Sequence, residues 1–140
     1  MEKIRILYAE GYDLVLLTAK QRLEAEGWEV EVCRSGAAAL KKLGGSERYD
    51  LLIFDDRLDD LSAADLVERA RLTGRLPAAP VILFTARHVN GDPPPHWAAA
   101  CLGKPAGLKE LVETCRRLLP QAEAPQGSEV LGGEPQEVAD

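Results

Sequence analysis

Polar side chains with complementary chemistry stand where short apolar runs of this sequence stop. They are an acid, an acidic pair, a hydroxyl and a lysine, namely Glu10, Asp55 with Asp56, Thr85 and Lys104. A carboxylate can act as a nucleophile or as an oxygen ligand for a cation, and a lysine can neutralise an anion. A carboxylate directly after Leu-Leu-Ile-Phe is costly near a core unless it is paired, and Lys104 is the available partner. These residues are therefore the candidate site.

The elements that must position them alternate along the chain. Short runs rich in strand formers predict strands over residues 4–9, 29–33, 50–55, 80–85 and 100–102. Helical spacing of apolar residues predicts helices over 14–25, 36–43, 62–72 with Ser62 as N-cap and Gly74 after its end, and 107–119. Alternating strands and helices imply a parallel sheet with helices on both sides. The carboxyl ends of its strands would bring the polar residues to one edge, where ligands bind in such sheets.

Length and charge limit the classes of function. The 140 residues are 46% apolar and 29% charged and carry a net charge of −6 at pH 7, which fits one globular domain. Residues 121–140 hold five acids and no base, so residues 1–120 are close to neutral. We therefore expect a folded domain over 1–120 and a disordered acidic tail over 121–140. Neither a basic face nor an output domain is evident, which argues against nucleic-acid binding.

Targeting signals and cysteine chemistry are also not indicated. No apolar run is long enough to span a membrane, and the N-terminus does not resemble a signal peptide, so we expect a soluble, cytoplasmic protein without membrane contact. Three cysteines, Cys33, Cys101 and Cys115, show neither CxxC nor Cys/His spacing. We expect them to be small core residues rather than a disulfide framework or a zinc site.

Three motifs together resemble the receiver domain of bacterial two-component response regulators. They are YDLLIFD (49–55), PVILFTAR (80–87) and the Lys104-Pro105 pair, and the resemblance covers about residues 3–119. It implies a three-layer, flavodoxin-like α/β fold, a doubly wound five-stranded parallel sheet in the order 2-1-3-4-5.

The resemblance also implies roles for individual residues. Asp55 would be the phospho-acceptor, attacking a phosphohistidine on a sensor histidine kinase or a phosphotransfer protein. Thr85 would be the switch hydroxyl, and Lys104 would pair with a phosphoryl oxygen. Mg²⁺ would be held by Glu10, Asp55 and the backbone carbonyl of Arg57. The protein would then act in a phosphorelay, through contacts with a downstream protein that the sequence does not identify.

The sequence departs from the family pattern at several points. Gly11 replaces the second acid of the family's acidic pair, which weakens the metal site, and Cys101 occupies the position of the aromatic switch. Prolines 93–95 predict a fourth helix that is shortened or absent. Asp59-Asp60 replaces the usual Pro-Gly turn.

Three functions remain open on these residues. The first is a stand-alone receiver phosphorylated at Asp55, and the second is a pseudo-receiver, a binding module that works without phosphorylation. The third, remote alternative is a phosphatase of the haloacid dehalogenase type, whose second aspartate would stand where this chain has Arg57. We expect the protein not to be an enzyme. Simpler interpretations are that Glu10 only pairs with Lys104 and that Trp97 packs over the shortened helix instead of anchoring a partner.

Overall fold

Five parallel strands form the centre of the molecule. The computed structural model describes residues 3–11, 13–86, 93–104 and 107–120, so the predictions for the tail over 121–140 lie outside the described residues. The strands are β1 (Arg5–Ala9), β2 (Glu29–Cys33), β3 (Leu51–Phe54), β4 (Val81–Thr85) and β5 (Ala100–Gly103). They pair in the order β2-β1-β3-β4-β5, all parallel, so the predicted fold class is confirmed.

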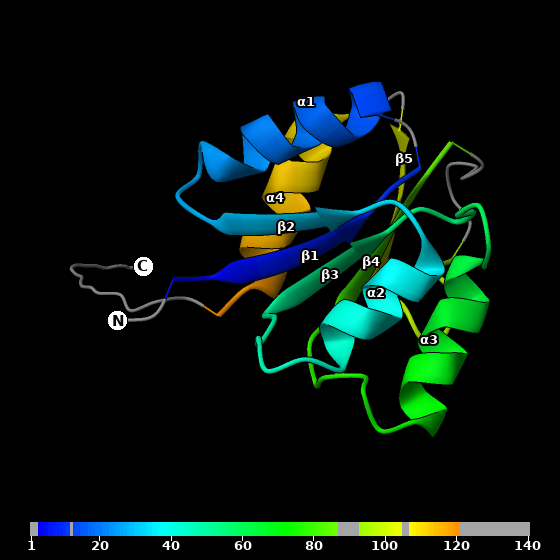
Figure 1. Ribbon diagram of the computed structural model, residues 1–140. Helices are drawn as coiled ribbons and strands as arrows, with labels where there is room; N and C mark the ends of the chain where they lie inside the picture. The colour runs from blue at the N-terminus through cyan, green and yellow to red at the C-terminus, as the bar shows by residue number, and fades with distance from the viewer. Residues whose placement is uncertain (1–2, 12, 87–92, 105–106, 121–140) are drawn as a thin grey trace.

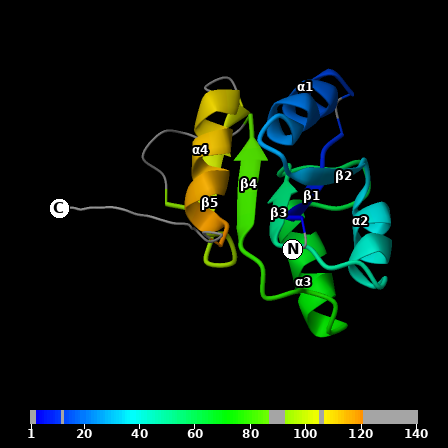
Figure 2. The same ribbon diagram turned by 90° about the vertical axis from the view of Figure 1, so that its left-hand side faces the viewer.

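Helices cover both faces of this sheet. They are α1 (Asp13–Glu24), α2 (Gly36–Leu43), α3 (Ala63–Leu72) and α4 (Leu108–Leu118). Figures 1 and 2 show α1 and α4 on one face and α2 and α3 on the other. The alternation of side chains along a strand divides β1 between two cores: Ile6 and Tyr8 face α1 and α4, whereas Leu7 and Ala9 face α2 and α3.

The central strand explains why the sheet is doubly covered. All four residues of β3 are buried, as the continuous apolar run predicts for a strand with helices on both sides. Each such Leu, Ile or Phe contributes about 1.5–3 kcal/mol of hydrophobic free energy when it leaves water. The two cores therefore hold the carboxyl ends of β1, β3 and β4 in fixed relative positions.

Most predicted boundaries differ from the observed ones by one or two residues. The helix predicted over 14–25 runs from Asp13 to Glu24, and the one over 36–43 is observed with the predicted ends. Ser62 caps α3 by accepting a hydrogen bond from the Asp65 amide at 3.1 Å, as predicted. The helix ends at Leu72 as predicted, and Gly74 follows with a φ of +73°, a conformation that glycine adopts without strain.

The connection between β4 and β5 contains no helix in its described part, which is Ala86 and residues 93–99. Residues 87–92 of the predicted loop lie outside the described residues. Pro95 begins a turn in which its carbonyl accepts a hydrogen bond from the Ala98 amide at 3.0 Å. The prolines lack the amide hydrogens that a helix interior needs, which explains the turn.

The loop after β3 is fastened to the start of α2. The Asp60 carboxylate accepts hydrogen bonds from the Gly36 amide at 2.7 Å and from the Ala37 amide at 2.9 Å. These backbone bonds lower the pKa of Asp60, because they stabilise its charged form. Leu61 packs so closely on Gly36 that a β-carbon there would lie 2.5 Å from Leu61 Cδ1. The Asp59-Asp60 turn is thus a helix cap supplied from another element.

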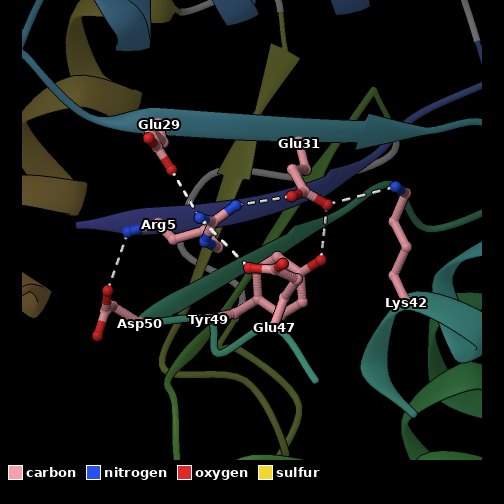
Figure 3. Close-up of polar contacts among 7 residues, drawn as sticks. All are labelled: Arg5, Glu29, Glu31, Lys42, Glu47, Tyr49 and Asp50. Carbon is pink, nitrogen blue, oxygen red and sulfur yellow. Dashed lines mark hydrogen bonds and ion pairs between the residues drawn. The ribbon is translucent and has the colours of Figure 1, made fainter. Parts of the chain in front are cut away.

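A polar network connects the strands near their amino-terminal ends (Figure 3). Glu31 on β2 accepts hydrogen bonds from Arg5 at 2.7 Å and from the Tyr49 hydroxyl at 2.8 Å, and Lys42 lies 3.3 Å away. Burial alone would raise the pKa of Glu31, but the bonds from Tyr49 and Lys42 and the nearby positive charges outweigh it and lower the pKa. Arg5 also pairs with Glu29 at 2.9 Å. The network joins the edge strand β2 to β1, α2 and the start of β3.

The cysteines match the expectation only in part. Cys33 and Cys115 are buried, and their burial raises the pKa of these thiols to about 11 and about 12. Cys101 is only half-buried, which corrects its assignment as a core residue, because β5 is an edge strand. All three are free thiols. Among the described residues, no helix is long and apolar enough to cross a membrane.

Candidate functional site

The predicted site residues lie at the carboxyl edge of the sheet. Glu10 directly follows β1, Asp55 directly follows β3, and Thr85 ends β4, and all three are buried. Backbone hydrogen bonds continue the sheet into the site, since the Asp55 amide donates to the Ala9 carbonyl at 3.0 Å. The acidic side chains are therefore placed by the strands that carry them.

Lys104 joins the two carboxylates. Its Nζ lies 2.8 Å from Glu10 Oε2 and 3.1 Å from Asp55 Oδ2, although the two acids come from different strands. Glu10 is fully buried and the Lys104 side chain is 11% exposed, so solvent screens these pairs little. The prediction that Lys104 pairs with Asp55 is confirmed in geometry, and so is its simpler pairing with Glu10.

A buried tyrosine, which the sequence analysis did not single out, completes this group. The Tyr8 hydroxyl donates a hydrogen bond to Glu10 Oε1 at 3.2 Å, and both side chains are fully buried. Burial, followed by the charge of Glu10, raises the pKa of Tyr8 well above its usual value, so the hydroxyl stays a donor. The signal in the sequence is the i, i+2 spacing on one strand, which puts Tyr8 and Glu10 on the same face.

The described residues fit Mg²⁺ poorly. Both oxygens of Glu10 are engaged, one by Tyr8 and one by Lys104, and Gly11 offers no side-chain ligand. In the part of the chain that the structure describes, no three His, Cys, Asp or Glu side chains form a group that could hold a metal. Around Gly11 the space is open, because a β-carbon built there has no atom within 4 Å. The third carboxylate could therefore be accommodated, but the sequence lacks it.

Asp56 and Arg57 belong to the loop that leads from Asp55 to α3. Arg57 is exposed, and its backbone forms an isolated bridge with Ser62 on the far side of the loop. The Asp56 carbonyl accepts a hydrogen bond from the Ala63 amide at 2.8 Å, which ties the loop to α3. The ammonium of Lys104 contacts both buried acids, whereas the Arg57 side chain is exposed to solvent.

The two predicted switch positions lie on β4 and β5. Thr85 is buried two residues beyond Leu83, which is in register with Phe54, so it lies at the same edge as Asp55. Cys101 faces the α2 and α3 side, where it packs with Trp97 on that core. Trp97 is half-buried and packs against this core, whereas the described part of the connection holds no helix over which it could pack as predicted.

A shallow groove runs from this edge along α1. Its hollow of about 220 Å³ is lined by Leu14, Val15, Thr18, Phe84, Lys104 and Leu108. Leu14 is 78% exposed and Leu17 on the same helix is 56% exposed. Exposed leucines beside a charged site are typical of a surface that another protein covers. A larger hollow, about 410 Å³ between Arg48 and Arg75, lies at the opposite edge of the sheet and away from the acids.

Comparisons with solved structures agree with this arrangement. The receiver domain of the hybrid histidine kinase CckA is 30% identical, with a TM-score of 0.70 over 83% of this chain and 99% of that one. The response regulator TrrA from Thermotoga maritima, solved in complex with Mg²⁺ and BeF, is also 30% identical, with a TM-score of 0.71 over the same shares of the two chains.

Curated relatives are longer proteins. A CpxR homolog of Haemophilus influenzae, a transcriptional regulatory protein, is 29% identical over 109 residues, covering 76% of this chain and 46% of its own length. The transcriptional regulatory protein TrcR of Mycobacterium tuberculosis is 29% identical over 119 residues, covering 83% and 45%. The chain thus spans about half the length of these relatives. No protein-family model matches the sequence.

The fold and the strand order agree with those of the relatives that this chain covers almost from end to end. The chain belongs to the response regulator receiver domains, the CheY-like signalling family.

Proposed function

We propose that this receiver domain accepts a phosphoryl group on Asp55 and signals through protein contacts, with a divalent cation bound weakly or not at all. The observation that carries the proposal is the position of Lys104 Nζ, 3.1 Å from Asp55 Oδ2 at the carboxyl edge of the sheet. Acceptor and counter-charge are therefore in place before any donor arrives, which is the main requirement of phosphoryl transfer.

The chemistry follows from that geometry. A carboxylate oxygen of Asp55 attacks the phosphorus of a phosphohistidine or of acetyl phosphate, the bond to the donor breaks, and an acyl phosphate forms. Lys104 exchanges part of its pairing with the carboxylates for a phosphoryl oxygen, and Thr85 donates its hydroxyl to another. With Gly11 in place of an acid, neutralisation relies on Lys104, so we expect transfer to be slow.

The phosphodonor would be a sensor histidine kinase or a phosphotransfer protein. Support comes from the groove beside Lys104, where exposed Leu14 of α1 adds apolar surface, and Leu17 is exposed on the same helix. A donor helix that covers this surface would bring its histidine to Asp55. The half-exposed Cys101 and the helix-free described part of the β4–β5 connection indicate a rebuilt surface for the downstream partner.

The experiment incubates the chain with Mg²⁺ and acetyl phosphate, or with beryllofluoride, and detects the adduct by intact mass or by NMR. We expect slow, partial modification that disappears in Asp55→Asn. Gly11→Asp should accelerate it, since the space around Gly11 is open, whereas the matched control Gly11→Ala adds the β-carbon without the carboxylate and should not.

The alternative function is a pseudo-receiver that binds its partner without phosphorylation. The observation in its favour is that Lys104 already satisfies both Glu10 and Asp55. If neither the native chain nor Gly11→Asp forms an adduct while both remain folded, Asp55 is not an acceptor and this alternative replaces the proposal.

A further inference from the structure

Tyr8 and Lys104 both contact Glu10, the fully buried acid of the site. Its hydroxyl lies 3.2 Å from Glu10 Oε1, while Lys104 Nζ lies 2.8 Å from Glu10 Oε2. Tyr8 and Glu10 are both fully buried, so water does not compete for these bonds. Each carboxylate oxygen of Glu10 therefore already has a donor inside the protein.

Releasing Glu10 from this position is costly. If its carboxylate turned toward a cation at the edge of the sheet, the Tyr8 hydroxyl would be left in the core without its acceptor. A buried donor without a partner is strongly disfavoured.

We propose that Tyr8 is a positioning residue that holds Glu10 against Lys104 and so prevents Glu10 from coordinating a divalent cation. Lys104 then serves as the resident cation of the site, 2.8 Å from one carboxylate and 3.1 Å from the other. The weak metal binding of the proposed function would have two causes, the lost carboxylate at position 11 and the engaged carboxylate at position 10.

Removing only the hydroxyl separates these causes. In Tyr8→Phe the ring still fills the core, but Glu10 Oε1 loses its donor and gains by turning to a cation from solution. We expect Mn²⁺, used as a spectroscopic substitute for Mg²⁺, to bind about tenfold more tightly, the change that about 1.4 kcal/mol produces. Mg²⁺ should displace it.

The assay measures free Mn²⁺ by electron paramagnetic resonance in the presence of the full chain, with no phosphodonor. Tyr49→Phe is the matched control, because it removes another tyrosine hydroxyl bonded to a glutamate, 2.8 Å from Glu31 at the opposite edge of the sheet. We expect Tyr49→Phe to leave Mn²⁺ binding unchanged. Gly11→Asp should strengthen Mn²⁺ binding because it supplies the missing carboxylate. Its effect should add to that of Tyr8→Phe.

An unchanged or weaker Mn²⁺ affinity in folded Tyr8→Phe would show that Tyr8 only fills the core. If Tyr8→Phe does not fold, Tyr8→Leu also removes the hydroxyl while Glu10 and Lys104 stay unchanged, and the same gain is expected. The inference rests on the proposed function in taking this edge as the phosphoryl site, yet its test needs no phosphorylation. An adduct on Asp55 with unchanged Mn²⁺ affinity in Tyr8→Phe would refute the inference alone.

Discussion

Replacing Lys104 by Met should destabilise the domain more than any loss of a surface charge. Lys104→Met keeps the length and apolar stem of the side chain but removes the ammonium from between Glu10 and Asp55. Those two carboxylate oxygens are each bonded to one nitrogen, so they are about 6 Å apart at most, and their repulsion at an effective dielectric constant of about 20 is about 3 kcal/mol. Leaving buried charges without their partner costs roughly 3–5 kcal/mol in other proteins.

The loss is a large fraction of the roughly 5–15 kcal/mol that stabilises a domain of this size. With a urea dependence of about 2 kcal/mol per molar, the unfolding midpoint should fall by about 2 M. Trp28 and Trp97 report the two cores separately, since each packs against a different one. Their fluorescence should show one coincident transition.

Two comparisons make the measurement decisive. In Lys104→Met with Glu10→Gln one buried negative charge is gone, so more than half of the lost stability should return. Lys20→Met on α1 is the control, because Lys20 lies 3.5 Å from Glu24 on the surface and its loss should cost less than about 1 kcal/mol. A midpoint for Lys104→Met equal to that of Lys20→Met would refute the view that the ammonium neutralises both acids.

Three further predictions concern other parts of the molecule. Asp60→Ala should cost about 1 kcal/mol, because two amides at the start of α2 lose their acceptor. Since the pKa of Asp60 is lowered, the difference in urea midpoint should be full above the ordinary aspartate pKa of about 4 and fade as the pH falls through the lowered value. Tyr49→Phe should cost about 1 kcal/mol at pH 7, measured in the same way, because its bond to Glu31 is lost. A maleimide should label half-buried Cys101 much faster than Cys33, whose pKa of about 11 keeps the thiol protonated, and peptide mapping identifies the labelled residue. Equal labelling of the two cysteines would contradict the third prediction. A urea midpoint of Tyr49→Phe equal to that of the native chain would contradict the second. A loss of stability in Asp60→Ala that does not change with pH would contradict the first.

Local patterns predicted the strands, the helices and the parallel sheet, whereas the strand order came from the resemblance to receiver domains. The apolar run of β3 predicts a strand covered on both faces, and the Ser62 cap predicts the start of α3, because these features depend on neighbours in the chain. Gly74 likewise predicted the end of α3, because glycine adopts without strain the positive φ with which many helices end. Half-buried Cys101 was mispredicted because the expectation used only the general tendency of free cysteines to be buried and not the place of its strand at the edge of the sheet.

For the site, too, the sequence determined one part and the tertiary structure the other. The sequence by itself determined that Glu10, Asp55 and Lys104 follow strands of a parallel sheet and so meet at one edge, and that Gly11 supplies no carboxylate there. Only the tertiary structure decided how the charges are shared, with Lys104 bridging both acids and Tyr8 holding the second oxygen of Glu10. The reason is physical: strand order fixes which edge a side chain reaches, but a hydrogen bond depends on distances of a few tenths of an ångström, which packing of the two cores sets.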